Sequence, residues 1–126
     1  MTDTDPRFLA IRTVLMPRDT NEAGTIFGGV IMSHIDLAGG VEAYKHHDGR
    51  IVTVSVHELL FKKPVYVGDI VSFYTRTLKK GTTSVTVHVD VEVQRRHDPN
   101  VTEKVTEAEI VYVAVDEHWK PTPLRQ

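Results

Sequence analysis

Hydrophobic and polar residues alternate along most of the C-terminal half of the chain. The clearest case is residues 84–93, where every second position from Val85 onward is valine and the positions between are polar. This alternation predicts a strand that buries one face in an antiparallel sheet. Less regular apolar segments bounded by turn residues predict four further strands, at residues 8–16, 51–61, 70–78 and 105–115.

Residues 27–44 lack this alternation and are long enough for about four helical turns. The segment contains four glycines, each of which costs roughly 1 kcal/mol of helix propensity relative to alanine. Something other than propensity must therefore hold this helix. We expect it to be buried against a surface that approaches its backbone closely, because glycine permits such an approach.

The predicted order is a strand, a helix and four more strands. The connections among the last four strands are short enough for hairpins, so we expect an antiparallel sheet. A single apolar helix must then pack on the apolar face of that sheet. A central helix wrapped by a five-stranded antiparallel sheet is the hotdog arrangement, an α+β fold. We expect one domain over residues 1–126, with a core at about 8–116 and a polar tail at 117–126.

Composition excludes several classes of function. A net charge of −2 and the absence of a basic excess argue against nucleic acid as a partner. The chain has no cysteine, which excludes disulfides and a thiol nucleophile. The N-terminus is acidic and unlike a signal peptide, and no apolar run reaches the length that spans a bilayer. We therefore expect a cytoplasmic protein with no membrane partner.

Asp36 is the sharpest candidate for chemistry, because it lies in the middle of the predicted apolar helix. A buried ionised carboxylate is costly unless it is hydrogen-bonded or used. A partly exposed helical aspartate that caps a neighbouring loop would fit the spacing equally well. Helical spacing places Asp36 on one face with mostly small residues, namely Gly29, Met32, Ser33, Gly40 and Ala43.

Gly28 and Gly29 form a second candidate at the expected start of the helix. Unpaired amides there, together with the helix dipole, favour developing negative charge, although a glycine pair can also serve close packing alone. Gly28 and Asp36 are eight residues apart, or about 12 Å along a helix. Groups that act on one carbonyl must lie within roughly 3 Å of it. The two candidates can therefore cooperate only between two chains of a symmetric dimer.

Other pairs of polar residues are weaker candidates. Ser33 and His34 are adjacent on the helix and do not face each other, so they do not predict a nucleophile and base. The strand residues His57, Glu58 and His88 lack metal-ligand spacing, and we expect no metal site.

Residues 16–29, MPRDTNEAGTIFGG, resemble the opening motif of the hotdog acyl-CoA thioesterases. The most similar group is the short bacterial acyl-CoA thioester hydrolases, related to the brain acyl-CoA hydrolase of mammals. Residues 32–36, MSHID, resemble the helix motif of that group. Later segments also resemble it, at residues 50–54, 63–69, 80–84 and 112–116. The likeness runs from about residue 12 to residue 123.

The resemblance implies a role for particular residues. Asp36 matches the catalytic aspartate, and Asn21 matches a loop asparagine that acts from the opposing subunit. Gly28 and Gly29 match the helix start that receives the thioester carbonyl. The residues implied to contact the pantetheine or coenzyme A are Thr53, Val54, Lys80, Gly81, Thr82 and Ser84.

The resemblance also implies hydrolysis of acyl-CoA without a metal or redox cofactor, so that coenzyme A enters only as part of the substrate. It implies a homodimer unit assembled into a trimer of dimers. Val30 and His34 differ from the residues common in relatives, and we expect them to shape the acyl pocket. Two alternatives remain open: a dehydratase or hydratase of 3-hydroxyacyl thioesters, and a non-catalytic acyl-CoA binding module.

Overall fold

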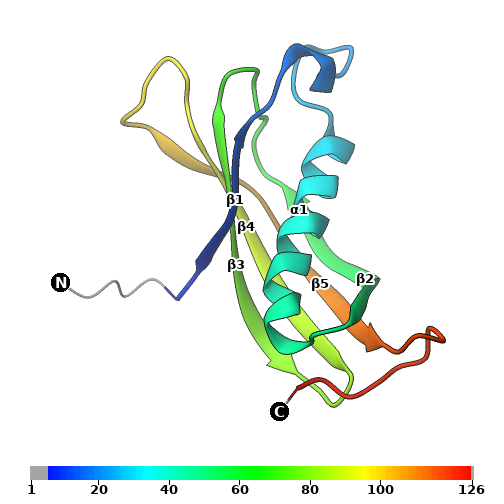
Figure 1. The fold of residues 1–126 in the computed structure, drawn as a ribbon. Coiled ribbons are helices and arrows are strands. Elements are labelled where there is room, and N and C mark those ends of the chain that lie inside the picture. The colour runs from blue at the N-terminus through cyan, green and yellow to red at the C-terminus, as the bar shows by residue number, and fades with distance from the viewer. Residues whose placement is uncertain (1–5, 126) are drawn as a thin grey trace.

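A computed structural model describes residues 6–125, in which one helix lies across one face of a five-stranded antiparallel sheet (Figure 1). The sheet order is β1-β3-β4-β5-β2. This arrangement confirms the predicted hotdog fold. The elements are β1 (Phe8–Val14), α1 (Gly28–Ala43), β2 (Arg50–Phe61), β3 (Ile70–Lys80), β4 (Ser84–Gln94) and β5 (Thr102–Val115), with short 3-10 turns at Pro17–Asp19 and Tyr44–His46.

One of the expected hairpins is wrong. β3 pairs with β4 and β4 with β5, as expected, but β2 pairs with β5 at one edge while β3 lies between β1 and β4. The connection at residues 62–69 therefore crosses the end of the sheet. Val65 within it is buried, and its carbonyl accepts a hydrogen bond of 2.8 Å from the Ile26 amide just before α1. The length of a connection does not distinguish a hairpin from such a crossing.

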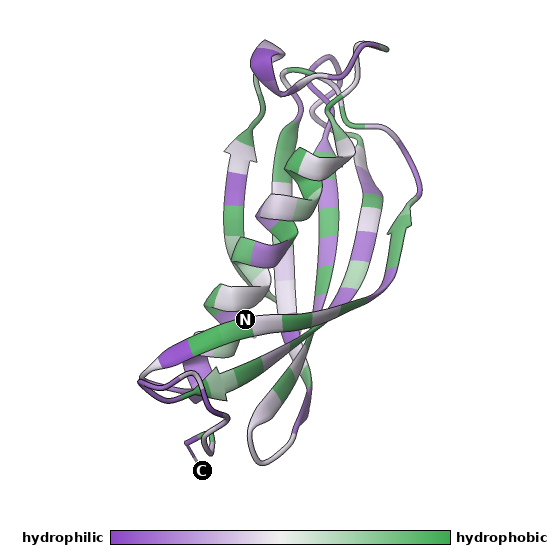
Figure 2. Cartoon of the chain, turned by 90° about the vertical axis from the view of Figure 1, so that its right-hand side faces the viewer, coloured by the Kyte–Doolittle hydropathy of each residue, from purple (hydrophilic) through white to green (hydrophobic). Residues whose placement is uncertain are grey.

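The core lies between α1 and the concave face of the sheet. The five alternating valines of β4 are each no more than 1% exposed, and they face the helix residues Ile31 and Ile35 within one cluster. The strands alternate between hydrophobic and hydrophilic residues, as Figure 2 shows. Within residues 6–125, no helix has both the length and the hydrophobicity needed to cross a membrane.

The end of α1 is tied to β3 by a buried carboxylate. Glu42 accepts hydrogen bonds from Thr75 (2.9 Å), Thr77 (2.8 Å) and Lys45 (2.8 Å). Burial alone would raise the pKa of Glu42, but these hydrogen bonds outweigh burial and hold the pKa below its ordinary value of 4.5. The carboxylate is therefore paired, and it serves as an anchor for the helix.

Gly39 explains part of the unusual glycine content of the helix. A Cβ atom at this position would lie 2.1 Å from the hydroxyl of Tyr112 on β5. The same hydroxyl donates a hydrogen bond of 2.8 Å to the backbone carbonyl of Asp36. Gly39 thus allows Tyr112 to reach the helix backbone, which confirms the expectation of a close approach.

Replacing Gly39 with alanine should lower the free energy of unfolding by about 1–3 kcal/mol, the usual range for forcing an extra group into a packed core. The added methyl group would overlap the Tyr112 hydroxyl. Chemical denaturation measures the change. The matched control is Gly39→Ala combined with Tyr112→Phe, which removes the obstructing oxygen and should recover part of the loss. Equal stability of Gly39→Ala and the unmodified protein would contradict this account of the packing.

Candidate active site

The carboxylate of Asp36 lies at the boundary between α1 and the sheet. Its Oδ1 accepts a hydrogen bond of 2.7 Å from Thr53 Oγ1 on β2. The single hydrogen of the Tyr112 hydroxyl on β5 is shared between the Asp36 backbone carbonyl at 2.8 Å and Oδ1 at 3.3 Å. Within residues 6–125 both bonds fall on Oδ1, which leaves Oδ2 for water or a substrate. The side chain is only partly buried. This geometry orients a carboxylate while leaving one oxygen accessible.

The sequence alone assigns no role to Tyr112, which lies within the segment at residues 112–116 that resembles the family. The tyrosine is 2% exposed. Burial, the charge of Asp36 and the hydrogen bond to Asp36 all raise the pKa of Tyr112 well above its ordinary value. The hydroxyl therefore stays neutral and donates, so it positions Asp36 instead of transferring protons. The signal that could have revealed Tyr112 is the glycine at position 39, which implies a large neighbour.

A cavity of about 280 Å³ opens beside Asp36, between α1 and the start of β2. Thr53 and Tyr112 contribute to its wall, and the other lining residues are mostly apolar. Two of these, Leu37 and Val41, are 63% and 43% exposed. The carboxylate therefore adjoins an apolar surface that is open to solvent in the single chain.

The start of α1 has free amide donors. Phe27 is the N-cap residue and makes no side-chain capping bond. Its carbonyl accepts from the amides of Val30 (3.0 Å) and Ile31 (3.4 Å), so that within residues 6–125 the amides of Gly28 and Gly29 have no acceptor. Two uncapped amides at a helix N-terminus form a site for negative charge.

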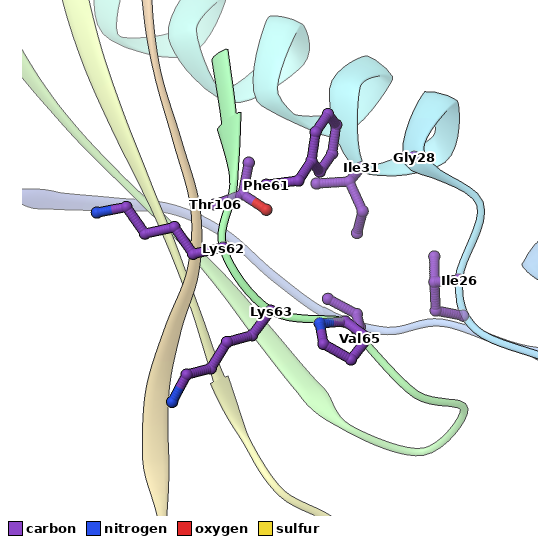
Figure 3. A pocket seen from close by; sticks show the side chains of 9 residues that line it. Ile26, Gly28, Ile31, Phe61, Lys62, Lys63, Val65 and Thr106 are labelled. Carbon is purple, nitrogen blue, oxygen red and sulfur yellow. The ribbon is translucent and has the colours of Figure 1, made fainter. Parts of the chain in front are cut away.

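A second cavity, of about 300 Å³, surrounds this helix start (Figure 3). Gly28 lies at its edge, and the cavity extends beneath Phe61 toward β5. None of its lining residues also lines the cavity at Asp36. Within one chain, Gly28 and Asp36 therefore open onto separate cavities, as the spacing of eight residues predicted.

Asn21 organises the loop before the helix. Its Oδ1 accepts hydrogen bonds from the amides of Ala23 (2.9 Å) and Thr25 (3.2 Å), and its Nδ2 donates to Thr25 Oγ1 (3.0 Å). An amide nitrogen carries two hydrogens, and within residues 6–125 only one of them is used. Asn21 therefore fixes the loop and still offers one donor.

The predicted coenzyme A residues fall into two places. Thr53 contacts Asp36, and Val54 beside it is 52% exposed on β2. Residues 80–84 form the turn between β3 and β4, at the end of the molecule where α1 finishes and far from its start (Figure 1). The C-terminal tail closes over this turn, where Thr82 accepts a 2.8 Å bond from Leu124 and Lys80 bonds to the Arg125 carbonyl.

The remaining candidates lie elsewhere. His34 stacks on Phe73 with ring centroids 5.5 Å apart, and its Nδ1 lies 2.9 Å from the Val30 carbonyl. Neither Val30 nor His34 lines the cavity at Gly28 or the one at Asp36 in the single chain, and the expectation that they shape the acyl pocket stays a prediction. Both side chains are partly buried and pack against the core.

The structure does group His88 with two carboxylates, which the sequence spacing did not indicate. Ligand atoms of His88, Asp90 and Glu107 lie within 4.8 Å of one another. The ammonium of Lys104 lies 2.8 Å from Asp90 Oδ1 and also contacts Glu107. Lys104 thus bridges both acids and Lys62 pairs with Glu107 as well, so the cluster is a network of ion pairs on the sheet.

Comparison with known proteins shows the family to which the chain belongs. Residues 23–99 match the family model described as the Thioesterase superfamily. The acyl-CoA thioester hydrolase YciA of Salmonella typhimurium is 44% identical over 98% of this chain and 95% of its own length.

Two solved structures are also similar. The hexameric thioesterase y2039 from Yersinia pestis has a TM-score of 0.89 and 43% identity, covering 94% of this chain and 96% of its own. An acyl-CoA hydrolase from Staphylococcus aureus, solved with butyryl coenzyme A and coenzyme A, has a TM-score of 0.83 and 30% identity, covering 91% and 70%. The fold and site thus define a hotdog thioesterase, and the chain belongs to the Thioesterase superfamily.

Proposed function

We propose that this protein hydrolyses acyl-CoA thioesters at sites shared between two subunits, with Asp36 from one chain and the start of α1 from the other. The observation that carries the proposal is the separation of the two groups. An oriented carboxylate and a pair of free amides occur on one helix but open onto different cavities. Both can act on one carbonyl only if a second helix passes the first in the opposite direction.

In the proposed reaction, the thioester carbonyl oxygen lies on the amides of Gly28 and Gly29. These donors stabilise the negative charge that develops on the oxygen. Asp36 either takes a proton from water that attacks the carbonyl carbon, or attacks it directly to form an anhydride that water then opens. In both routes the carbon–sulfur bond breaks and the coenzyme A thiolate leaves and takes up a proton.

Neighbouring residues support this chemistry. Thr53 and Tyr112 hold Oδ1 of Asp36, which lines the cavity, and leave Oδ2 without a bond within residues 6–125. The unused amide hydrogen of Asn21, from the opposing subunit, would orient the water or the carboxylate. A carboxylate and amide donors suffice for the reaction, so the proposed site needs no metal or redox cofactor.

An exposed edge favours the dimer. β2 is an edge strand of the sheet, and its residues Val54 and Val56 are 52% and 40% exposed. The adjoining face of α1 exposes Leu37 and Val41, and Tyr44 is exposed in the 3-10 turn that follows. Unpaired strand edges beside apolar surface are usually covered in stable proteins. We infer that a second copy covers this edge, and that such dimers assemble in threes like the hexameric relatives.

The coenzyme A part of the substrate would extend away from the shared site. We propose that Thr53 and Val54 border the pantetheine arm. We also propose that Lys80, Gly81, Thr82 and Ser84 lie near the nucleotide end.

Release of free thiol from a series of acyl-CoA substrates of different chain length tests the function, with light scattering of the same sample to give its mass. We expect thiol release from an assembly of at least two chains. Conversion of a 3-hydroxyacyl-CoA to the unsaturated thioester without thiol release would instead establish a dehydratase. Tight binding of acyl-CoA with no turnover would establish a binding module, and an active monomer would rule out the shared site.

A further inference from the structure

Thr106 on β5 is buried without a hydrogen-bond partner. Its side chain is 1% exposed, and its hydroxyl is the one buried side-chain polar atom within residues 6–125 that has no partner. Buried hydroxyls are nearly always hydrogen-bonded, since losing water without a replacement is unfavourable. An exception beside a cavity leaves the hydroxyl to bond with water or with a molecule that binds there.

Thr106 borders the cavity at the start of α1 (Figure 3). The wall opposite consists of the apolar side chains Ile26, Ile31 and Val65. Lys62 and Lys63 also border the cavity, but their amines point away from it in Figure 3. They pair with Glu107 (3.1 Å) and Glu103 (2.9 Å). Apart from the Gly28 amide at its edge, the cavity therefore has one neutral side-chain hydroxyl, that of Thr106, among mostly apolar side chains.

Phe61 connects this hydroxyl to the helix start. Phe61 pairs with Thr106 in the register of β2 and β5. The tip of its ring lies 3.5 Å from the position that a Cβ atom on Gly28 would occupy. A single phenylalanine side chain thus spans the space from Thr106 to the amide proposed to hold the carbonyl. A group attached to that carbonyl needs only a few atoms to reach Thr106.

We propose that Thr106 is a specificity-determining residue, whose hydroxyl bonds to a neutral oxygen on a short acyl group bound in this cavity. The inference rests on the proposed thioester hydrolysis and assigns the substrate class as short acyl-CoAs that carry a hydroxyl or keto oxygen. The pantetheine arm fits the cavity poorly, because its two amides need more partners than one hydroxyl. A carboxylated acyl group also fits poorly, because no cation points inward.

The cavity is large enough for a short acyl chain. Its volume of about 300 Å³ lies at the lower end of the range for ligand cavities, roughly 300–1,000 Å³. An acyl group of about four carbons with one added oxygen fits within this volume, and the short chain follows from the reach between the helix start and Thr106, not from the size of the cavity.

The test compares 3-hydroxybutyryl-CoA with butyryl-CoA by thiol release, in the unmodified protein, Thr106→Val and Thr106→Ser. Valine keeps the shape of threonine but removes the oxygen, and serine keeps the oxygen. One hydrogen bond is worth roughly 5–10-fold in kcat/KM, so the unmodified protein should prefer the hydroxylated substrate by about that factor. Thr106→Val should bring the ratio to about one or below, and Thr106→Ser should retain most of it.

An unchanged ratio in folded Thr106→Val would overturn the assignment, because a purely structural role affects both substrates alike. If Thr106→Val does not fold, the ratio in the unmodified protein decides: a value at or below one also overturns the proposal. Thiol release from butyryl-CoA but not from 3-hydroxybutyryl-CoA would overturn this inference and leave the proposed hydrolysis intact. No thiol release from either substrate would also overturn this inference, and the chain-length series described above then decides separately whether the proposed hydrolysis stands.

Discussion

Replacing Asp36 with asparagine should lower turnover by at least about 100-fold, because a general base or nucleophile typically contributes 10²–10⁴-fold. Asparagine keeps the shape of the side chain and an oxygen that can accept from Thr53 and Tyr112, as Oδ1 does now. It removes only the charge and the basicity. The protein should therefore stay folded, and KM should change far less than kcat.

Thiol release and thermal unfolding on one preparation of Asp36→Asn measure both effects. Asp116→Asn is the matched control, because its Oδ1 caps the amides of His118 and Lys120 in an exposed turn that lines neither the cavity at Asp36 nor the one at Gly28. The control should retain full activity. Near-normal turnover in folded Asp36→Asn would exclude Asp36 from the mechanism. A large loss of stability with normal turnover would mean that its charge serves the fold alone.

The strands and the helix could be predicted because local patterns determine them. The alternating valines of β4 have a period of two and are all buried on one face, so one segment of sequence predicted both the strand and its orientation. The separation of Gly28 from Asp36 was predictable for a similar reason, since it depends only on the rise of a helix. The structure adds that the two groups face different cavities.

The sequence could not predict contacts between distant segments. The position of β2 beside β5 depends on how the connection at residues 62–69 crosses the sheet, and its length fits either arrangement. Tyr112 and Thr106 carry no local signal, because each is one residue in a strand whose neighbours alternate in the same way. Their roles come from what lies opposite: the glycine at position 39 for Tyr112, and a cavity for Thr106.

Replacing Gly28 with proline should lower turnover by about 100–1,000-fold, the usual effect of removing one donor from an oxyanion site. Gly28 is the first residue of α1, where proline is well tolerated and only the amide hydrogen is lost. Phe27 before it already has the extended conformation that proline requires, with φ −61° and ψ 132°. Gly28→Ala is the matched control, because it adds the same ordinary contact with Phe61 at 3.5 Å but keeps the amide.

Mixing the two inactive variants tests whether the site is shared. In a dimer of one Asp36→Asn chain and one Gly28→Pro chain, one site has lost both groups. The other combines the Asp36 of one chain with the intact Gly28 amide of its partner. Random assembly makes half of the dimers mixed, so activity should recover to about a quarter of the unmodified level in a two-fold symmetric dimer.

If both groups acted within one chain, co-expressed variants would stay as inactive as each alone. Two results together would identify the amide hydrogen of Gly28 as the group that acts across the interface. The mixed dimers should recover activity, and Gly28→Ala alone, which fills the same space but keeps the amide, should retain nearly full activity.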